Sequence, residues 1–284
     1  MSNIINCNVD EEIEDINEKI QEFASLIEKS NYFTFIIEGG EDYTVYEPLE
    51  SFCDSAPRMV DILPVNGRPI ALGVFNKLKD TPYIKKVAFI VDQDTWVHIG
   101  KPAEYNHERI ICTTGYSIEN DIFIDRKLTC LMKSFDVYTD FELFLAEYLR
   151  WYVLAIERVI NDTVIKGDSL DIHPNQYFKQ NKKDELILLR ENEVFSECRF
   201  KEIFNDFSVK LRGKNLLDLF DWSANNRIEN KKDSPIPNGS KQAKSKKMPP
   251  YNLKLIMEET PRTLRGENLN RIFDTAKDFA MQSF

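Results

Sequence analysis

Acidic residues follow two apolar, β-branched segments of the chain. Glu38 follows the run Phe35-Ile36-Ile37, and Asp92 and Asp94 follow the run Phe89-Ile90-Val91. Such runs are typical of buried strands, and α/β folds place their ligands at the carboxyl ends of strands. Carboxylates gathered at that edge repel one another unless a cation lies between them. An all-oxygen set of hard ligands favours Mg²⁺ or Mn²⁺ over zinc or copper.

Composition and charge limit the classes of protein to consider. The chain has 284 residues, of which 42% are hydrophobic, enough for one elaborated domain or two. A formal net charge of −10 argues against nonspecific nucleic-acid binding by the whole surface, since such binding needs Lys and Arg to neutralise phosphates. A local basic patch is compatible with that charge. The five cysteines are widely spaced without a CxxC pair, which indicates a reducing, cytoplasmic setting.

No segment approaches the ~20 apolar residues that a membrane span needs. The amino terminus begins acidic and lacks the basic region of a signal peptide. We therefore expect a soluble, cytoplasmic protein with no membrane partner.

Apolar spacing predicts an alternation of strands and helices. Strands are expected at residues 32–37, 59–65, 86–91 and 109–113, with a further short strand at 186–189. Helices are expected at 13–27, after the turn at Gly39-Gly40 with Glu41 and Asp42 in the first turn, and at 70–78, 139–165, 197–207 and 268–284. This order predicts an α/β fold: a mostly parallel sheet flanked by helices, with right-handed crossovers and a largely helical C-terminal extension.

The expected domain organisation has three regions. Residues 1–30 form a helix that packs on the core, residues 31–135 form the core with the acidic motifs, and residues 136–284 form the helical extension. Within the extension, residues 227–252 are rich in Lys, Ser, Asn and Pro, a composition that does not pack a core. We expect a flexible basic loop or linker there. The alternative is a basic arm that contacts a nucleic-acid backbone.

The order and placement of the acidic motifs resemble the TOPRIM domain. The likeness is greatest to its OLD-nuclease branch, and within it to compact proteins whose TOPRIM domain stands alone without a fused ATPase. It rests on Glu38-Gly39 after a strand, Asp42 four residues on from Glu38, Asp92-x-Asp94 after a later strand and Ser117-Ile118-Glu119 after the next. The matching core covers residues 30–125, and Arg212-Gly213-Lys214 is a further match.

The resemblance implies a TOPRIM-like core that hydrolyses phosphodiester bonds with two Mg²⁺ or Mn²⁺ ions as cofactor. The implied metal ligands are Glu38, Asp42, Asp92, Asp94, Ser117 and Glu119. Ser117 and Glu119 complete the second metal position in this assignment. Such cleavage does require a carboxylate cage on chemical grounds. Two acids are adjacent after the Gly39-Gly40 turn, so Glu41 stays open as the alternative ligand to Asp42.

Lys214 is the basic residue of the implied site. It would neutralise charge on the scissile phosphate, where a lysine supplies positive charge as negative charge develops. The resemblance thus assigns catalysis to Glu38, Asp92, Asp94 and Lys214. The alternative for Lys214 is an ordinary surface lysine.

The acidic motifs also have structural interpretations. Glu38 would cap the helix that follows it, because the amino end of a helix favours an acid. Asp92 and Asp94 would form an acidic turn. Ser117 followed three residues later by Asn120 is typical of a helix start. Capping alone does not account for acids at three successive strand ends.

We expect a metal-dependent endonuclease whose substrate is RNA or DNA, with transfer RNA implied by the resemblance. The resemblance also implies a toxic effector of a phage-defence system, restrained by an ATPase partner and active as a released homodimer. Because Gly39-Gly40 lacks the Gly-Lys-Ser/Thr ending of a phosphate-binding loop, the ATPase would be a separate subunit. The alternatives are a regulatory or scaffold subunit with a degenerate TOPRIM fold and a small-molecule phosphotransfer enzyme.

Overall fold

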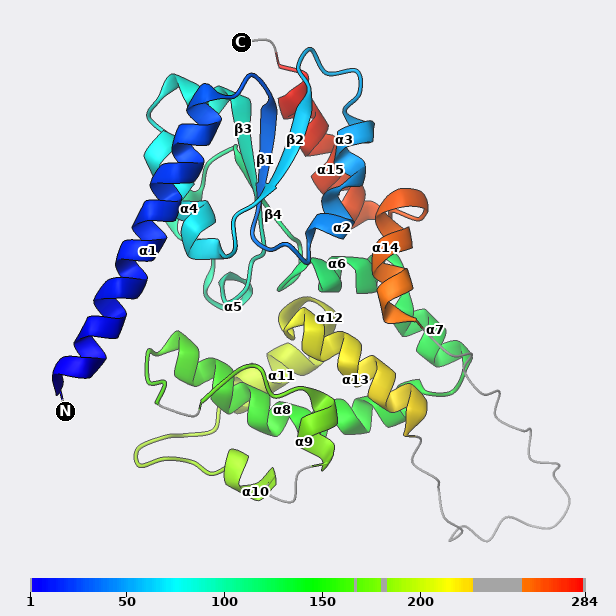
Figure 1. Cartoon of the computed structure of the whole chain (residues 1–284). Coiled ribbons are helices and arrows are strands. Elements are labelled where there is room, and N and C mark those ends of the chain that lie inside the picture. The colour runs from blue at the N-terminus through cyan, green and yellow to red at the C-terminus, as the bar shows by residue number, and fades with distance from the viewer. Residues whose placement is uncertain (1, 166–167, 180–182, 227–251, 283–284) are drawn as a thin grey trace, which may run out of the picture. The chain divides into compact units, whose positions relative to one another are not determined.

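The computed structural model describes residues 2–165, 168–179, 183–226 and 252–282 (Figure 1). The chain divides into two compact units: unit 1 comprises residues 1–93, 101–114 and 254–284, and unit 2 comprises residues 94–100 and 115–253. The division differs from the expected boundaries, because the closing helices belong to the unit that holds the sheet. The basic segment expected at 227–252 lies outside the described residues except for Asn252.

Unit 1 contains a sheet with helices on both faces (Figure 1). The strands are β1 (Phe33–Ile37), β2 (Val60–Pro64), β3 (Val87–Val91) and β4 (Ile110–Cys112). The helices are α1 (Ser2–Lys29), α2 (Tyr43–Tyr46), α3 (Pro48–Phe52), α4 (Arg68–Leu78), α14 (Leu253–Thr263) and α15 (Glu267–Ala280), with 3₁₀ turns at Pro82–Lys86 and Ala103–Tyr105. Each of these strands lies inside its expected range, and the α/β prediction is confirmed.

All strand pairs are parallel, in the order β2-β1-β3-β4. The chain moves one way from β1 to β2 and returns across β1 to reach β3, so right-handed crossovers place α3 and α4 on opposite faces. Figure 1 shows α1 and α4 on one face and α2, α3 and α15 on the other. The direction of winding reverses between β1 and β3. Their carboxyl ends therefore flank the switch point at which such sheets bind ligands.

The two central strands are buried along their whole length. A strand covered on both faces reads as a continuous apolar run, which explains the sequences Phe33–Ile37 and Val87–Val91. The α1 helix reaches this core through α4, where Ile20 packs against Gly73. A Cβ atom at Gly73 would lie 2.2 Å from Ile20 Cδ1, so a larger residue there would require the Ile20 side chain to move.

Unit 2 is helical. Its helices are α5 (Trp96–Ile99), α6 (Ile118–Asp125), α7 (Leu128–Ser134), α8 (Tyr138–Ile160), α9 (Pro174–Lys179), α10 (Lys183–Leu186), α11 (Glu197–Asn205), α12 (Phe207–Lys210) and α13 (Gly213–Asn225). The long helix α8 is the one expected at 139–165, and α11 and α13 pack against it. It ends earlier, at Ile160, because Asp162 adopts a left-handed conformation with φ of 54°.

The strand expected at 186–189 is wrong. Residues 183–186 form α10, and the next residues are irregular, with Leu188 and Leu189 64% and 50% exposed. The Leu188 carbonyl accepts a hydrogen bond of 3.1 Å from Arg158 Nη2, so it takes a side-chain donor instead of a neighbouring strand.

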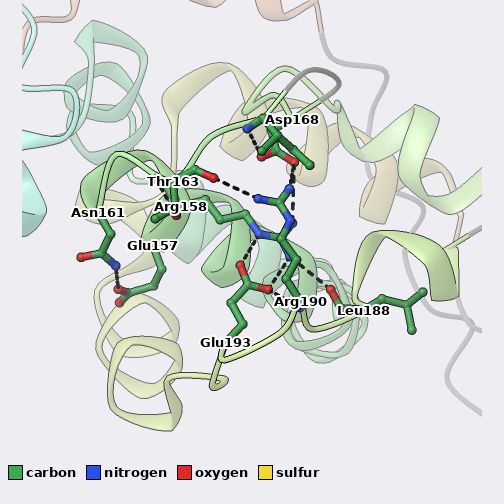
Figure 2. A network of polar contacts seen from close by, with 9 residues as sticks. Glu157, Arg158, Asn161, Thr163, Asp168, Leu188, Arg190 and Glu193 are labelled. Atoms are coloured by element: carbon green, nitrogen blue, oxygen red, sulfur yellow. Dashed lines mark hydrogen bonds and ion pairs between the residues drawn. The ribbon is translucent and has the colours of Figure 1, made fainter.

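A network of ion pairs holds the irregular segments of unit 2 to the end of α8 (Figure 2). Arg158 donates two hydrogen bonds to the Glu193 carboxylate, at 2.6 and 2.7 Å, while Arg190 pairs with Asp168 and donates to the Thr163 carbonyl at 3.0 Å. Arg158 is buried and Glu193 is half-buried, so these bonds are shielded from water. The hydrogen bonds from Arg158 lower the pKa of Glu193 to about 2 from 4.5, although burial opposes the shift.

Replacing Arg158 by Met should destabilise unit 2 by about 2–4 kcal/mol, because it leaves the Glu193 charge without its partner. The folded-state pKa of Glu193 lies below its ordinary value, so the pair's contribution is complete above pH 4.5 and declines toward pH 2. Urea unfolding at several pH values measures both effects. The exposed Arg150→Met on the same helix is the control; an equal loss in both variants, or a loss independent of pH, would contradict the expectation.

Candidate functional site

In unit 1, Glu38 and Asp92 follow the adjacent parallel strands β1 and β3, in which Ile37 pairs with Ile90. Glu38 Oε1 accepts a hydrogen bond of 2.9 Å from the Asp92 backbone N–H. Both side chains belong to half-buried residues. The N-cap of the following helix is Asp42 and not Glu38, so the capping interpretation of Glu38 is wrong. The structure thus brings Glu38 and Asp92 together at the switch point.

Asp42 folds back over the turn that follows Glu38. Its Oδ2 accepts a hydrogen bond of 3.1 Å from the Gly39 N–H, and a Cβ atom at Gly39 would approach the same oxygen to 3.1 Å. Glu41 belongs to the exposed surface of the turn. Of the two adjacent acids, Asp42 is the one that is turned toward the strand end.

Gln93, between the two acids of the Asp92-x-Asp94 motif, connects the ends of β3 and β4. Its Nε2 donates to the carbonyls of Thr113 and Thr114, each at 2.9 Å, and its N–H donates to Thr113 Oγ1 at 3.1 Å. Sequence reasoning missed Gln93 and Thr113. A polar residue between two acids at a strand end was the available signal, but its partners lie on another strand.

Two arginines bind backbone carbonyls at the same edge of the sheet. Arg68 Nη1 donates to the Gln93 carbonyl at 3.2 Å, and Arg271 Nη2 donates to the Cys112 carbonyl at 2.7 Å. Burial raises the pKa of the Cys112 thiol, while Lys101, Arg68 and Arg271 act in the opposite direction. Sequence reasoning missed these guanidinium groups too. Their positive charge at the carboxyl ends of the strands suits an anionic ligand.

In unit 2, Asp94 adopts a left-handed conformation with φ of 47°, which aspartate tolerates better than most residues. Its N–H donates to the Tyr116 carbonyl at 2.7 Å, and the Tyr116 N–H donates to the Val209 carbonyl at 2.7 Å. Backbone hydrogen bonds therefore connect Asp94, the loop before α6 and helix α12. Asp94 belongs to unit 2, whereas Asp92 belongs to unit 1.

Ser117 and Glu119 lie together at the start of α6. Ser117 Oγ donates to Glu119 Oε2 at 2.5 Å, and the two residues are only 6% and 8% exposed. Ser117 is also the N-cap of α6 and forms a capping box with Asn120, which is the helix start that the alternative interpretation predicted. The pair nevertheless presents two adjacent hard oxygen atoms, the donor type that Mg²⁺ prefers.

Lys214 is exposed in the first turn of α13. The residue before it, Gly213, is buried against the start of α6: a Cβ atom there would lie 2.2 Å from Ser117 Oγ and 2.8 Å from Glu119 Cβ. The glycine of the Gly213-Lys214 pair is therefore required by close packing. This contact brings the backbone that carries Lys214 next to Ser117 and Glu119.

His98, four residues after Asp94, is a poor proton donor at neutral pH. Burial, followed by the charges of Arg199 and Lys210, lowers the pKa of His98 to about 4, although Glu202 opposes the shift. The imidazole is therefore neutral near pH 7. Its ring packs edge-on against Tyr116, with 6.4 Å between ring centroids.

The donor types fit a hard divalent cation, since the predicted ligands offer carboxylate and hydroxyl oxygens. Their arrangement is less complete: within the described part of the chain, no three His, Cys, Asp or Glu side chains form a group able to hold a metal ion. What the structure brings together are pairs, Glu38 with Asp92 in unit 1 and Ser117 with Glu119 in unit 2.

Comparison with known proteins finds no family model that matches the chain and no curated protein with significant similarity to it. Among the described residues, no helix has both the length and the apolar character required to cross a bilayer. The described cysteines Cys53, Cys112, Cys130 and Cys198 are all free thiols.

Replacing His98 by Gln should flatten the pH dependence of stability. The folded-state pKa of about 4 lies below the ordinary 6.5, so the unfolded chain binds more protons between these values. The free energy of unfolding should therefore fall as the pH drops from 6.5 toward 4 in the wild type, and fall less in the variant. Urea titrations at half-unit pH steps measure this difference. Parallel pH profiles for the two proteins would contradict a buried, neutral His98.

Proposed function

We propose that this chain is a metal-dependent nuclease of the TOPRIM type that hydrolyses phosphodiester bonds of RNA or DNA. The observation that carries the proposal is the placement of Glu38 and Asp92 at the ends of adjacent parallel strands, with Glu38 bound to the Asp92 amide. A helix cap does not need this arrangement. Two acids held at a switch point form a place for a cation and its anionic ligand.

The metal ligands proposed in unit 1 are Glu38, Asp42 and Asp92, and those in unit 2 are Asp94, Ser117 and Glu119. Bound Mg²⁺ or Mn²⁺ would activate water and stabilise the charge that develops on the phosphate. The chain's own contribution is to hold these oxygens in place. Hydrogen bonds to the backbone and between side chains already fix one oxygen each of Glu38, Asp42 and Glu119.

The basic residues have a separate role in this proposal. Lys214 would place a positive charge on the scissile phosphate, and Arg68 and Arg271 would favour an anionic chain at the edge of the sheet. A body with net charge −10 does not attract polynucleotides over its whole surface. We therefore infer a substrate that is recognised locally and by shape, and structured RNA suits that description.

The biological setting is proposed from the sequence resemblance. The motifs resemble those of AriB, the TOPRIM effector subunit of the PARIS phage-defence system, which implies a toxic effector that cleaves transfer RNA. The same likeness implies restraint by a separate ATPase subunit and activity as a released homodimer in the cytoplasm. These partners are proposals by analogy.

A second candidate is a regulatory or scaffold subunit whose acids have no catalytic role. The observation that favours it is the capping box at Ser117 and Asn120, which gives the motif residue Ser117 a structural function. This candidate would be supported if the wild type has no nuclease activity and a variant that lacks one of the carboxylates loses its binding to a partner.

Replacing Glu38 by Gln should abolish cleavage while leaving the fold intact, since the amide oxygen still accepts the Asp92 N–H but carries no charge. The measurement is incubation of purified protein with bacterial transfer RNA, single-stranded DNA and plasmid, each with Mg²⁺ or Mn²⁺ or with EDTA. The matched control is Glu41→Gln, which removes an acid from the same turn. We expect cleavage by the wild type and the control, and a loss of at least about 100-fold in the Glu38 variant.

The nuclease assignment is contradicted if cleavage persists in EDTA or if Glu38→Gln and Glu41→Gln cut at the same rate. No cleavage of any of these substrates by the purified wild type favours the scaffold candidate.

Divalent metal should raise the melting temperature of the wild type more than that of Asp92→Asn. A cation that binds only the folded state stabilises it by RT ln(1 + [M]/Kd), or about 2.7 kcal/mol at 100 times Kd. Asp92→Asn removes one ligand charge and also reduces the repulsion within the metal-free cluster. Scanning calorimetry with and without Mn²⁺ measures both changes, and the exposed Asp80→Asn is the control. Equal metal responses in the three proteins would remove Asp92 from the site.

A further inference from the structure

Asn120 is buried in unit 2, with 0% of its surface exposed. Its Nδ2 donates to the carbonyls of Ser208 and Leu211, each at 2.9 Å, and its Oδ1 accepts from the Ser117 N–H at 3.0 Å. Ser117 Oγ lies 3.3 Å from the same Oδ1 but 2.5 Å from Glu119 Oε2, so we place its single proton on the shorter contact. The amide of Asn120 is therefore satisfied on both its donor and its acceptor side.

These hydrogen bonds do more than begin a helix. A capping box needs only the contact with Ser117. The two donated bonds reach Ser208 in α12 and Leu211 directly after it, and Leu211 precedes Arg212-Gly213-Lys214. Aspartate in its ionised form lacks both donors, and serine is too short to span the two sides. Asparagine is therefore the side chain that suits this place, because it connects two segments that are far apart in the sequence. Asn120 and Leu211 are 91 residues apart.

The same junction is packed closely from its other side. A Cβ atom at Gly213 would lie 2.7 Å from Asn120 Oδ1, and one at Gly115 would lie 2.4 Å from Asn120 Cβ. The Tyr116 N–H donates to Val209 beside these contacts. Hydrogen bonds and close packing therefore fix the start of α13 against the start of α6, so the two helix ends have little freedom to move relative to each other.

We propose that Asn120 is a positioning residue, which holds the Lys214-bearing start of α13 in register with the oxygens of Ser117 and Glu119. The inference rests on the proposed nuclease function and adds a residue that acts through Lys214 and does not itself touch substrate. A misplacement of about 1 Å in such a group costs about 100-fold in rate. Replacing Asn120 should therefore remove most of the contribution that Lys214 makes to the rate of cleavage.

A double-variant cycle of Asn120→Ser and Lys214→Ala tests the proposal. The rate is measured under single turnover with Mg²⁺, on whichever of transfer RNA, single-stranded DNA or plasmid the wild type cuts, at a temperature where all variants are folded by circular dichroism. We expect Lys214→Ala to be slower by about 100-fold and Asn120→Ser by about 10- to 100-fold. The double variant should be about as slow as Lys214→Ala alone, since a mispositioned lysine has little left to lose.

The matched control is Asn215→Ser. Asn215 is equally buried at 0%, lies on α13, and donates to the Leu170 carbonyl at 3.2 Å. A merely structural role for Asn120 predicts multiplied rate losses in the cycle, or an Asn120→Ser rate equal to that of Asn215→Ser, and either result overturns the proposal. If Asn120→Ser does not fold, Asn120→Asp takes its place in the same cycle, because an ionised aspartate keeps the acceptor oxygen but lacks both donors.

Failure of this inference is distinguishable from failure of the proposed function. A wild type that cuts with metal, combined with multiplied losses in the cycle, overturns the role of Asn120 alone. A wild type that cuts none of the three substrates overturns both.

Discussion

The parallel pairing of β1 with β3 is the constraint on which the rest of the unit 1 site depends. These central strands are buried on both faces, and their register sets Ile37 opposite Ile90. The residues that follow them must therefore emerge at one edge of the sheet, where the winding reverses. Glu38 and Asp92 are brought together by this topology and not by attraction, since like charges oppose their approach. The Asp92 N–H donated to Glu38 offsets part of that cost.

A different constraint organises the residues of unit 2. Ser117, Glu119 and Lys214 lie on segments joined by backbone hydrogen bonds and by the close approach of Gly213 to Ser117. Lys214 can occupy the first turn of α13 at this place only because the preceding residue has no side chain. Close packing thus explains why a glycine precedes the lysine. The role that we propose for the Lys214 charge depends on the position that this packing gives to Lys214. Because Ser117 and Glu119 are buried, the hydrogen bond between them is electrostatically stronger than it would be in water.

The strands of the sheet could be predicted because continuous apolar runs bounded by turn residues are a local signal. The strand at 186–189 could not be excluded in that way, since the donor that occupies the Leu188 carbonyl is Arg158, 30 residues earlier. The acids could be predicted as residues at strand ends, but the residues whose hydrogen bonds hold these segments in place could not. Gln93 is hydrogen-bonded to Thr113, 20 residues away, and Asn120 to Ser208, 88 residues away. Contacts at such separations follow no local sequence pattern, so they could not be predicted. The choice between Glu41 and Asp42 likewise needed the geometry of the turn.

We propose that Glu38 and Asp92 together hold a divalent cation. The most direct measurement is a crystal structure of the full chain with Mn²⁺, collected at a wavelength where the anomalous signal of manganese is strong. We expect an anomalous peak within coordination distance of a Glu38 and an Asp92 carboxylate oxygen. Manganese bound elsewhere on the chain, with no peak at this edge of the sheet, would contradict it.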